Sequence, residues 1–216
     1  MQTLPHLQEE IALWNNGYTV IGIDEVGRGA FAGPVYVSAV AFTPTTDLQE
    51  ITRLCTLGIN DSKKLSPAKR KALSETLLTK NILHATASTD CDTINAKGIM
   101  HALNSAILQV TQELSAKIPQ QKAFVLLDGT HDPYKNTPDN ISYRNIIKGD
   151  GISLSIAAAS IIAKVTRDTY MSELAKKFPI YGWQKNKGYG TADHRQAIQT
   201  HGPCNHHRTL YIKKYL

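Results

Sequence analysis

Two adjacent carboxylates, Asp24 and Glu25, stand where a short apolar stretch at residues 20–23 ends. Such a stretch is typical of a buried strand. Because burying an unpaired carboxylate costs roughly several kcal/mol, we expect a cation beside the pair. No Lys or Arg precedes them within the stretch. Carboxylate oxygens are the ligands that Mg²⁺ takes in proteins, so the pair predicts a metal site.

A glycine-rich turn that carries one arginine follows directly, as Gly27, Arg28 and Gly29. Glycines allow the backbone to approach a flat or charged ligand closely. The arginine side chain and free backbone N–H groups suit a phosphate. The arrangement predicts acids that hold a divalent metal beside a loop that holds a nucleic-acid backbone. A plain hairpin turn would also use the glycines, but it would not explain the neighbouring acids.

Two further acids extend this pattern. Asp128 follows the apolar run at 123–127, and ligands gather at the carboxyl ends of strands in open α/β sheets. Asp168 lies on a helical stretch where it shares a face with Val165 and Ile161, so we expect it to face inward. Two metals about 3.5–4 Å apart can activate water and stabilise a leaving oxygen. Taken singly, Asp128 could simply begin a turn, and Asp168 could pair with Lys164.

The elements that must position these acids can be placed from periodicity and end signals. Strands are expected at residues 19–24, 35–42, 83–88, 123–127 and 143–148. Helices are expected at 67–79, with Ser66 as N-cap and Pro67 in the first turn, and at 93–117, 153–178 and 192–200. This order predicts an α/β sheet with helices on both faces, and one domain over residues 1–216.

The composition indicates a globular protein that binds polyanions. The 216 residues are 42% hydrophobic, enough for one substantial core, and no apolar stretch is long enough to cross a bilayer. Residues 176–216 carry a net charge of +7, which leaves the remainder near −1 and forms a basic C-terminal extension. A solvated cationic surface is the alternative. Three widely spaced cysteines and the absence of a signal sequence predict a cytoplasmic protein.

Seven segments, in this order and at this spacing, match a known family: 22–34 (GIDEVGRGAFAGP), 60–66 (NDSKKLS), 126–129 (LLDG), 148–150 (KGD), 155–168 (SIAAASIIAKVTRD), 187–191 (KGYGT) with His194, and 202–208 (GPCNHHR). On these segments, which are spread over most of the length of the chain, the sequence resembles bacterial ribonuclease HII, the type 2 ribonucleases H. The resemblance implies an RNase H-like fold, with a mixed five-stranded sheet, helices on both faces and a helical C-terminal extension.

The resemblance also implies an activity. The protein would hydrolyse the RNA strand of RNA–DNA hybrids, and would cut at single ribonucleotides embedded in duplex DNA, as ribonucleotide excision repair requires. The products would carry 5′-phosphate and 3′-hydroxyl ends. Two divalent ions, Mg²⁺ or Mn²⁺, would be held by the four acids, which are Asp24, Glu25, Asp128 and Asp168.

Five further residues match segments of the family that contact the substrate. Gly27, Arg28 and Gly29 would read the ribose 2′-hydroxyl, the group that distinguishes RNA from DNA. Tyr189 would stack on the sugar after the RNA–DNA junction, and Lys63 would line the phosphate path. Without the resemblance, Tyr189 could simply mark a turn and Lys63 could belong to a solvated loop.

Other interpretations stay open on the sequence. A resolvase- or integrase-like DNA nuclease would keep the fold, and a binding module without catalysis would need only the basic extension. Type 3 ribonucleases H tend to lack the arginine and to carry an extra N-terminal domain. The pair His206 and His207 stands where the family has one histidine, and with His201 and Cys204 it suggests zinc, although the spacing matches no common finger. We expect a monomer, and the sequence does not identify any protein partner.

Overall fold

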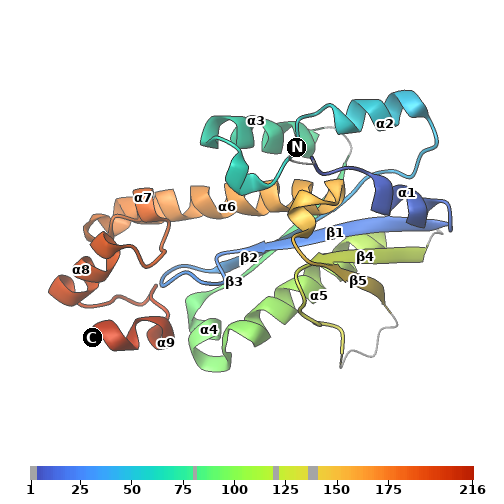
Figure 1. Ribbon diagram of the computed structural model, residues 1–216. Coiled ribbons are helices and arrows are strands. Elements are labelled where there is room, and N and C mark those ends of the chain that lie inside the picture. The colour runs from blue at the N-terminus through green and yellow to red at the C-terminus, as the bar shows by residue number, and fades with distance from the viewer. Residues whose placement is uncertain (1–3, 80–81, 119–121, 136–140) are drawn as a thin grey trace.

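A mixed five-stranded sheet forms the centre of the computed structural model, which describes residues 4–79, 82–118, 122–135 and 141–216 (Figure 1). Its strands are β1 (Tyr18–Val26), β2 (Val35–Ala41), β3 (Leu83–Thr89), β4 (Lys122–Asp128) and β5 (Ser142–Ile146). Their order is β3-β2-β1-β4-β5. The β1–β2 and β2–β3 pairs are antiparallel, whereas β1–β4 and β4–β5 are parallel. The predicted α/β fold with a mixed sheet is confirmed.

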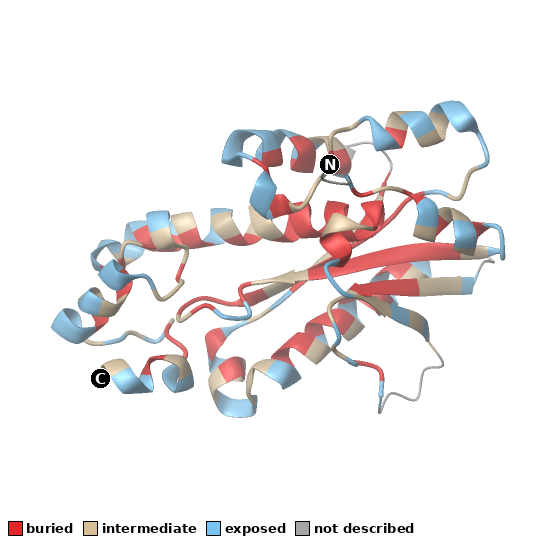
Figure 2. Ribbon diagram, viewed as in Figure 1, coloured by how far each residue is buried: buried red, intermediate tan, exposed pale blue. Residues whose placement is uncertain are grey.

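Helices cover both faces of this sheet, and apolar side chains from both layers form the core (Figures 1 and 2). One face packs against α1 (Gln8–Trp14), α2 (Leu48–Cys55), α3 (Pro67–Thr79) and α6 (Leu154–Lys177). The other face packs against α4 (Cys91–Lys97) and α5 (Ile99–Lys117). The predicted helix at 67–79 is confirmed to the residue, and the Ser66 hydroxyl accepts a hydrogen bond from the Lys69 N–H at 3.3 Å.

The long helix α6 lies unusually close to the central strand. A Cβ atom on Gly22 of β1 would approach the carbonyl carbon of Ser155 to 2.3 Å, so only glycine fits at this crossing. Helix α6 begins at Leu154, and the hydroxyl of the preceding Ser153 caps it by accepting from the Ile156 N–H. Because Gly22 and Asp24 are two residues apart on a strand, they share the face that α6 covers.

One local expectation was wrong. The predicted helix at 93–117 is interrupted at Gly98, where a φ of +84° ends α4 and α5 begins. On α6, Asp168 is partly buried, with 23% of its side chain exposed, while the neighbouring Arg167 is fully buried. The most deeply buried charged residue on this turn is therefore an arginine that a pattern of apolar residues does not reveal.

A separate apolar cluster joins the end of α6 to the C-terminal segments α7 (Trp183–Asn186) and α8 (Ala192–His201), and α9 (Thr209–Ile212) follows them in the chain. These segments lie beside the turn between β1 and β2 (Figure 1). The predicted helix at 192–200 is confirmed. That residues 1–216 fold as one domain with a C-terminal extension stays a prediction. None of the helices in the described ranges is both long and apolar enough to cross a membrane.

Candidate active site

The register of the parallel strands brings two of the predicted acids together. Ile23 of β1 pairs with Leu127 of β4, so the next residues, Asp24 and Asp128, are neighbours at the carboxyl ends of the two strands. Glu25 follows, and its backbone N–H donates to Asp24 Oδ1 at 2.7 Å. The β1 strand continues through both acids to Val26 rather than ending before them.

Asp24 is the most deeply buried of these acids, with 5% of its surface exposed. Burial raises the pKa of Asp24 well above its ordinary value, and the charges of Glu25 and Asp128 raise it further. The Ser160 hydroxyl, which comes from α6, opposes this by lowering the pKa. A buried carboxylate beside two others is poorly solvated and repelled by its neighbours, and a bound cation would compensate both effects.

The two neighbouring acids show the same effect in milder form. Burial raises the pKa of Glu25, although the guanidinium of Arg28, 3.8 Å from Glu25 Oε1, lowers it. Burial also raises the pKa of Asp128, while the Gly149 N–H, which donates to Asp128 Oδ1 at 2.6 Å, lowers it. All three acids therefore hold their protons more strongly than free carboxyl groups do.

A fourth acid at this site is Asp150, which the strand-end argument passed over. It lies on the turn Gly149–Gly151, is 6% exposed, and its charge raises the pKa of Asp128. Lys63 Nζ lies 3.3 Å from Asp150 Oδ2. The segment KGD at 148–150 carries the sequence signal, but it follows a short, mostly polar strand and so resembles an ordinary turn.

Asp168 is placed differently from the other predicted acids. Its Oδ1 accepts from Lys164 Nζ at 2.7 Å, which is the pairing one helical turn apart that the sequence also allowed. Its charge acts on Arg167 and Lys187. No described contact joins it to Asp24, Glu25 or Asp128, so its role as a metal ligand stays a prediction.

The donor chemistry at the strand ends fits a hard divalent cation. Asp24, Glu25, Asp128 and Asp150 offer only oxygen ligands. Arg28 and Lys63 offset part of their charge, but the pKa values of Asp24, Glu25 and Asp128 stay raised. Within the residues that the structure describes, no three His, Cys, Asp or Glu side chains converge on one point. The evidence that these acids fit a divalent cation is therefore the mutual effect of their charges on their pKa values and the oxygen donors that they offer.

The loop of Gly27, Arg28 and Gly29 follows β1 directly beside these acids. Gly27 has a φ of +88°, and a Cβ there would come within 2.2 Å of Arg167 Nε. Gly29 is exposed and faces open space. Half of the Arg28 side chain is exposed. The loop thus presents backbone and a guanidinium to solvent beside the acids, which is the arrangement that the sequence predicted.

Tyr189 and Lys63 both lie next to this centre. The N–H groups of Phe31 and Ala32 donate to the carbonyl of Gly188 at 2.8 and 3.1 Å, which brings the Tyr189 segment against the glycine loop. The Arg167 guanidinium lies 5.3 Å from the centroid of the Tyr189 ring. Burial lowers the pKa of Lys63, but the charge and hydrogen bond of Asp150, together with the charges of Asp61 and Asp24, outweigh burial, so the pKa is raised.

The adjacent histidines are separated by the fold. His207 is buried, and its Nε2 lies 3.1 Å from Nε2 of His194, whereas His206 packs edge-on against Phe178. The Cys204 N–H donates to His207 Nδ1 at 3.0 Å. Within the described part of the chain, His201, Cys204, His206 and His207 do not form a group that could hold a metal ion.

Comparison with known proteins places this site in a family context. The family model described as Ribonuclease HII matches residues 21–214. Ribonuclease HII of Caldicellulosiruptor bescii is 39% identical over 98% of this chain and 95% of its own. The RNase HII of Archaeoglobus fulgidus, solved as a complex with PCNA, superposes with a TM-score of 0.70 at 26% identity, covering 88% of this chain and 93% of that one.

A type 3 structure shares the fold over a smaller part of its own chain. Bst-RNase HIII, solved in complex with Mn²⁺, superposes with a TM-score of 0.68 at 22% identity, covering 92% of this chain but 69% of its own. The uncovered part of the type 3 chain agrees with the expectation that type 3 proteins carry additional sequence.

Proposed function

This chain belongs to the ribonuclease HII family of metal-dependent endonucleases that act on RNA–DNA hybrids, and we propose that it also cuts at single ribonucleotides in duplex DNA. The observation that carries the proposal is the placement of Asp24 and Asp128 at adjacent strand ends, beside a loop of Gly27, Arg28 and Gly29. The acids suit a metal, and the loop suits a ribose and its phosphate.

We propose that Asp24, Glu25 and Asp128 hold two divalent ions, Mg²⁺ or Mn²⁺, and that Asp150 completes the set. The coupling of Asp150 to Asp128 favours it over Asp168, which Lys164 already neutralises. When bound, such ions activate the attacking water and stabilise the leaving oxygen, which gives 5′-phosphate and 3′-hydroxyl ends. The protein's contribution is to crowd buried carboxylates so that cation binding relieves their repulsion.

Substrate recognition is assigned to the loop and its neighbours. Exposed backbone at Gly29 and the half-exposed Arg28 side chain can meet a ribose 2′-hydroxyl and an adjacent phosphate. The Tyr189 ring, which packs over Arg167, is available to stack on a sugar. Lys63, with 77% of its side chain exposed, is placed to contact the phosphate chain near Asp150.

The alternative functions fit the site less well. A DNA nuclease would have no hydroxyl for the loop to read, and a binding module without catalysis would not need crowded acids with raised pKa values. All three cysteines are free thiols, which supports the proposal that the protein acts in the cytoplasm.

The test offers the protein three duplexes of equal length: all-DNA, RNA–DNA hybrid, and DNA with one ribonucleotide. We expect cleavage of the second and third with Mg²⁺ or Mn²⁺, no cleavage with EDTA, and recovery when excess metal is restored. Cleavage of the all-DNA duplex, or cleavage that ignores the chelator, would overturn the proposal.

A further inference from the structure

The C-terminal segment at 204–211 is hydrogen-bonded along the turn between β1 and β2, residues 27–34, which includes the loop of Gly27, Arg28 and Gly29. This turn is called the glycine loop below. The Arg208 N–H donates to the carbonyl of Phe31 at 2.7 Å, and the Gly33 N–H donates to the carbonyl of His206 at 2.9 Å. The Arg208 side chain adds two bonds to the carbonyl of Gly33, from Nε at 3.0 Å and from Nη2 at 2.8 Å. The loop therefore takes its shape partly from residues about 180 positions later in the chain.

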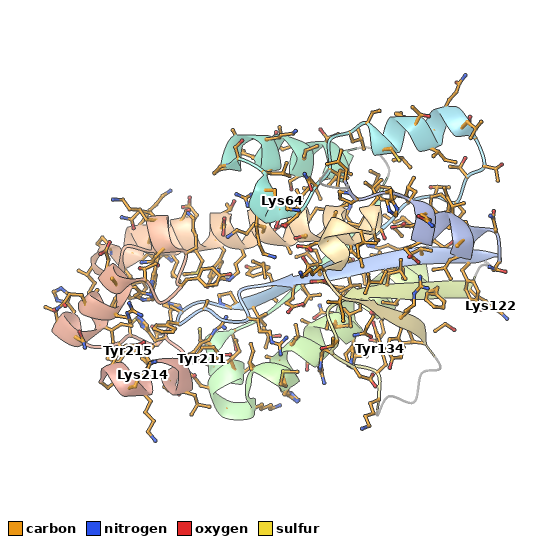
Figure 3. All side chains as sticks on the ribbon, in the orientation of Figure 1. Lys64, Lys122, Tyr134, Tyr211, Lys214 and Tyr215 are labelled. Atoms are coloured by element: carbon orange, nitrogen blue, oxygen red, sulfur yellow. The ribbon has the colours of Figure 1, made fainter. Side chains whose placement is uncertain are left out.

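Two further donors from this segment converge on one atom, the carbonyl oxygen of Arg28. Arg208 Nη1 donates to it at 2.9 Å, and the Tyr211 hydroxyl donates to it at 3.0 Å. The Arg208 guanidinium lies 5.5 Å from the centroid of the Tyr211 ring, so the two side chains also pack together. Figure 3 labels Tyr211 on α9, at the end of the molecule that holds the β1–β2 turn.

Arg208 is fully buried, and in the described residues no carboxylate lies within ion-pair distance of it. Burial lowers its pKa, but a guanidinium remains charged in proteins. Its charge is therefore directed at the loop carbonyls, and bonds from a charged donor are about twice as strong as neutral ones. The carbonyl of Arg28 has both of its acceptor positions occupied and is fixed in direction.

Fixing this carbonyl fixes the next N–H group. The peptide between Arg28 and Gly29 is trans, so its N–H points opposite to its C=O. The Gly29 N–H therefore points away from Arg208 and Tyr211. Among the described residues it has no hydrogen-bond acceptor, and open space lies around Gly29. It is a donor held in one direction and left for a ligand.

We propose that Tyr211 and Arg208 are positioning residues that set the specificity for ribonucleotides. They hold the Arg28 carbonyl so that the Gly29 N–H meets the oxygen of the ribose 2′-hydroxyl. This inference rests on the proposed function, in which the glycine loop reads that hydroxyl. A single ribonucleotide offers one hydroxyl in one position and needs the donor in its set direction. A continuous hybrid offers a hydroxyl at every RNA residue and tolerates a less well-ordered loop.

The experiment compares two variants that each lose one phenolic hydroxyl. Tyr211→Phe removes the bond to the Arg28 carbonyl, and Tyr181→Phe removes a bond of the same kind to the carbonyl of Gly202 at 2.9 Å, away from the loop. The measurement is kcat/KM on the duplex with one ribonucleotide divided by kcat/KM on the hybrid. We expect Tyr211→Phe to lower this ratio about fivefold, as the loss of one neutral hydrogen bond allows, and Tyr181→Phe to leave it unchanged.

Thermal unfolding separates positioning from a general loss of structure. Because Tyr211 is partly exposed, we expect the melting temperature of the Tyr211→Phe variant to be less than about 3 °C below that of the wild type. An unchanged ratio in Tyr211→Phe, or an equal fall on both substrates, would overturn the inference.

Arg28→Ala and the wild-type protein test the proposed function separately. If the wild type does not cleave the duplex with one ribonucleotide, the proposed function is wrong. If the wild type cleaves this duplex and Tyr211→Phe has the same kcat/KM ratio as the wild type, only the inference about Tyr211 and Arg208 is wrong.

Discussion

Asp24 illustrates at the scale of one residue why an active site can weaken the protein that carries it. Its carboxylate is buried beside Glu25 and Asp128, and each of these raises its pKa. An acid whose pKa is raised in the folded state favours folding in its protonated form. As pH rises from the unfolded value near 4 through the folded value, this contribution to stability is lost unless a cation replaces the proton.

Replacing Asp24 by asparagine should therefore separate stability from activity. We expect Asp24→Asn to lose more than about 100-fold in hydrolysis rate, because a metal ligand is removed. In EDTA at about pH 8 the variant should be more stable than the wild type by about 1–3 kcal/mol, and the difference should shrink towards pH 4. Urea unfolding at both pH values provides the measurement. A variant less stable than the wild type at about pH 8 would contradict the assigned electrostatics.

Asp150 and Asp168 can be distinguished by the same type of substitution. Asp150 is coupled to Asp128 at the strand ends, whereas Asp168 is paired with Lys164 on its own helix. We expect Asp150→Asn to lower kcat more than about 100-fold and Asp168→Asn less than about tenfold. Steady-state cleavage of the RNA–DNA hybrid at saturating Mg²⁺ measures both. The reverse order of effects would restore Asp168 as the fourth ligand.

At the scale of elements, the crossing of α6 over β1 holds the site together. Gly22 lies under Ser155 of α6, and two residues later on the same strand face Asp24 meets Ser160 from the same helix. The N-terminus of α6 is further held by buried Glu10, whose Oε1 accepts from the Ser153 hydroxyl at 2.6 Å and the Ser155 N–H at 2.9 Å. Helix and strand therefore position the acid jointly.

A methyl group at this crossing should lower the stability of the protein. Gly22→Ala must move α6 away from the strand, because its new atom would meet backbone rather than a flexible side chain. We expect a loss of about 1–3 kcal/mol in unfolding free energy. Gly151→Ala is the control, since nothing lies within 4 Å of its added Cβ, and it should cost less than about 1 kcal/mol. Denaturant unfolding would contradict this prediction if the two variants were equally stable.

At the scale of the whole molecule, the C-terminal segments act as a second support for the loop that β1 leads into. Two buried histidines join these segments. Trp183 Nε1 donates to His194 Nε2 at 3.0 Å, so that nitrogen accepts, and His207 Nε2 must donate to it. The Cys204 N–H donates to His207 Nδ1, which therefore also accepts. This pattern requires both rings to be neutral.

Because both rings must be neutral, the contacts of His194 and His207 that join the C-terminal segments should weaken in acid. Burial and the neighbouring His194 lower the pKa of His207 to about 4. Its contribution to stability is complete above the unfolded value near 6.5 and is lost as pH falls towards 4, by about 3 kcal/mol at most. We expect the His207 imidazole resonance in NMR to stay that of a neutral ring down to about pH 5. Titration near pH 6.5 would show that the buried pair is not formed.

Local pattern was enough for much of this protein. Apolar runs ended by acids marked β1 and β4, and the glycine loop with its arginine stood beside Asp24 and Glu25 in the sequence itself. A strand or helix is decided by residues that are near in the chain, so periodicity and end signals find it. The parallel order of β1 and β4 then brought the two strand-end acids together as expected.

Only the tertiary structure decided which polar residues are buried and what they face. Asp150 beside Asp128, the full burial of Arg167 on α6, and Arg208 and Tyr211 on the Arg28 carbonyl all depend on segments far apart in the chain. The solvation and pKa of a charged group are set by whatever folds over it. That information lies in contacts between distant elements, and no local period of the sequence contains it.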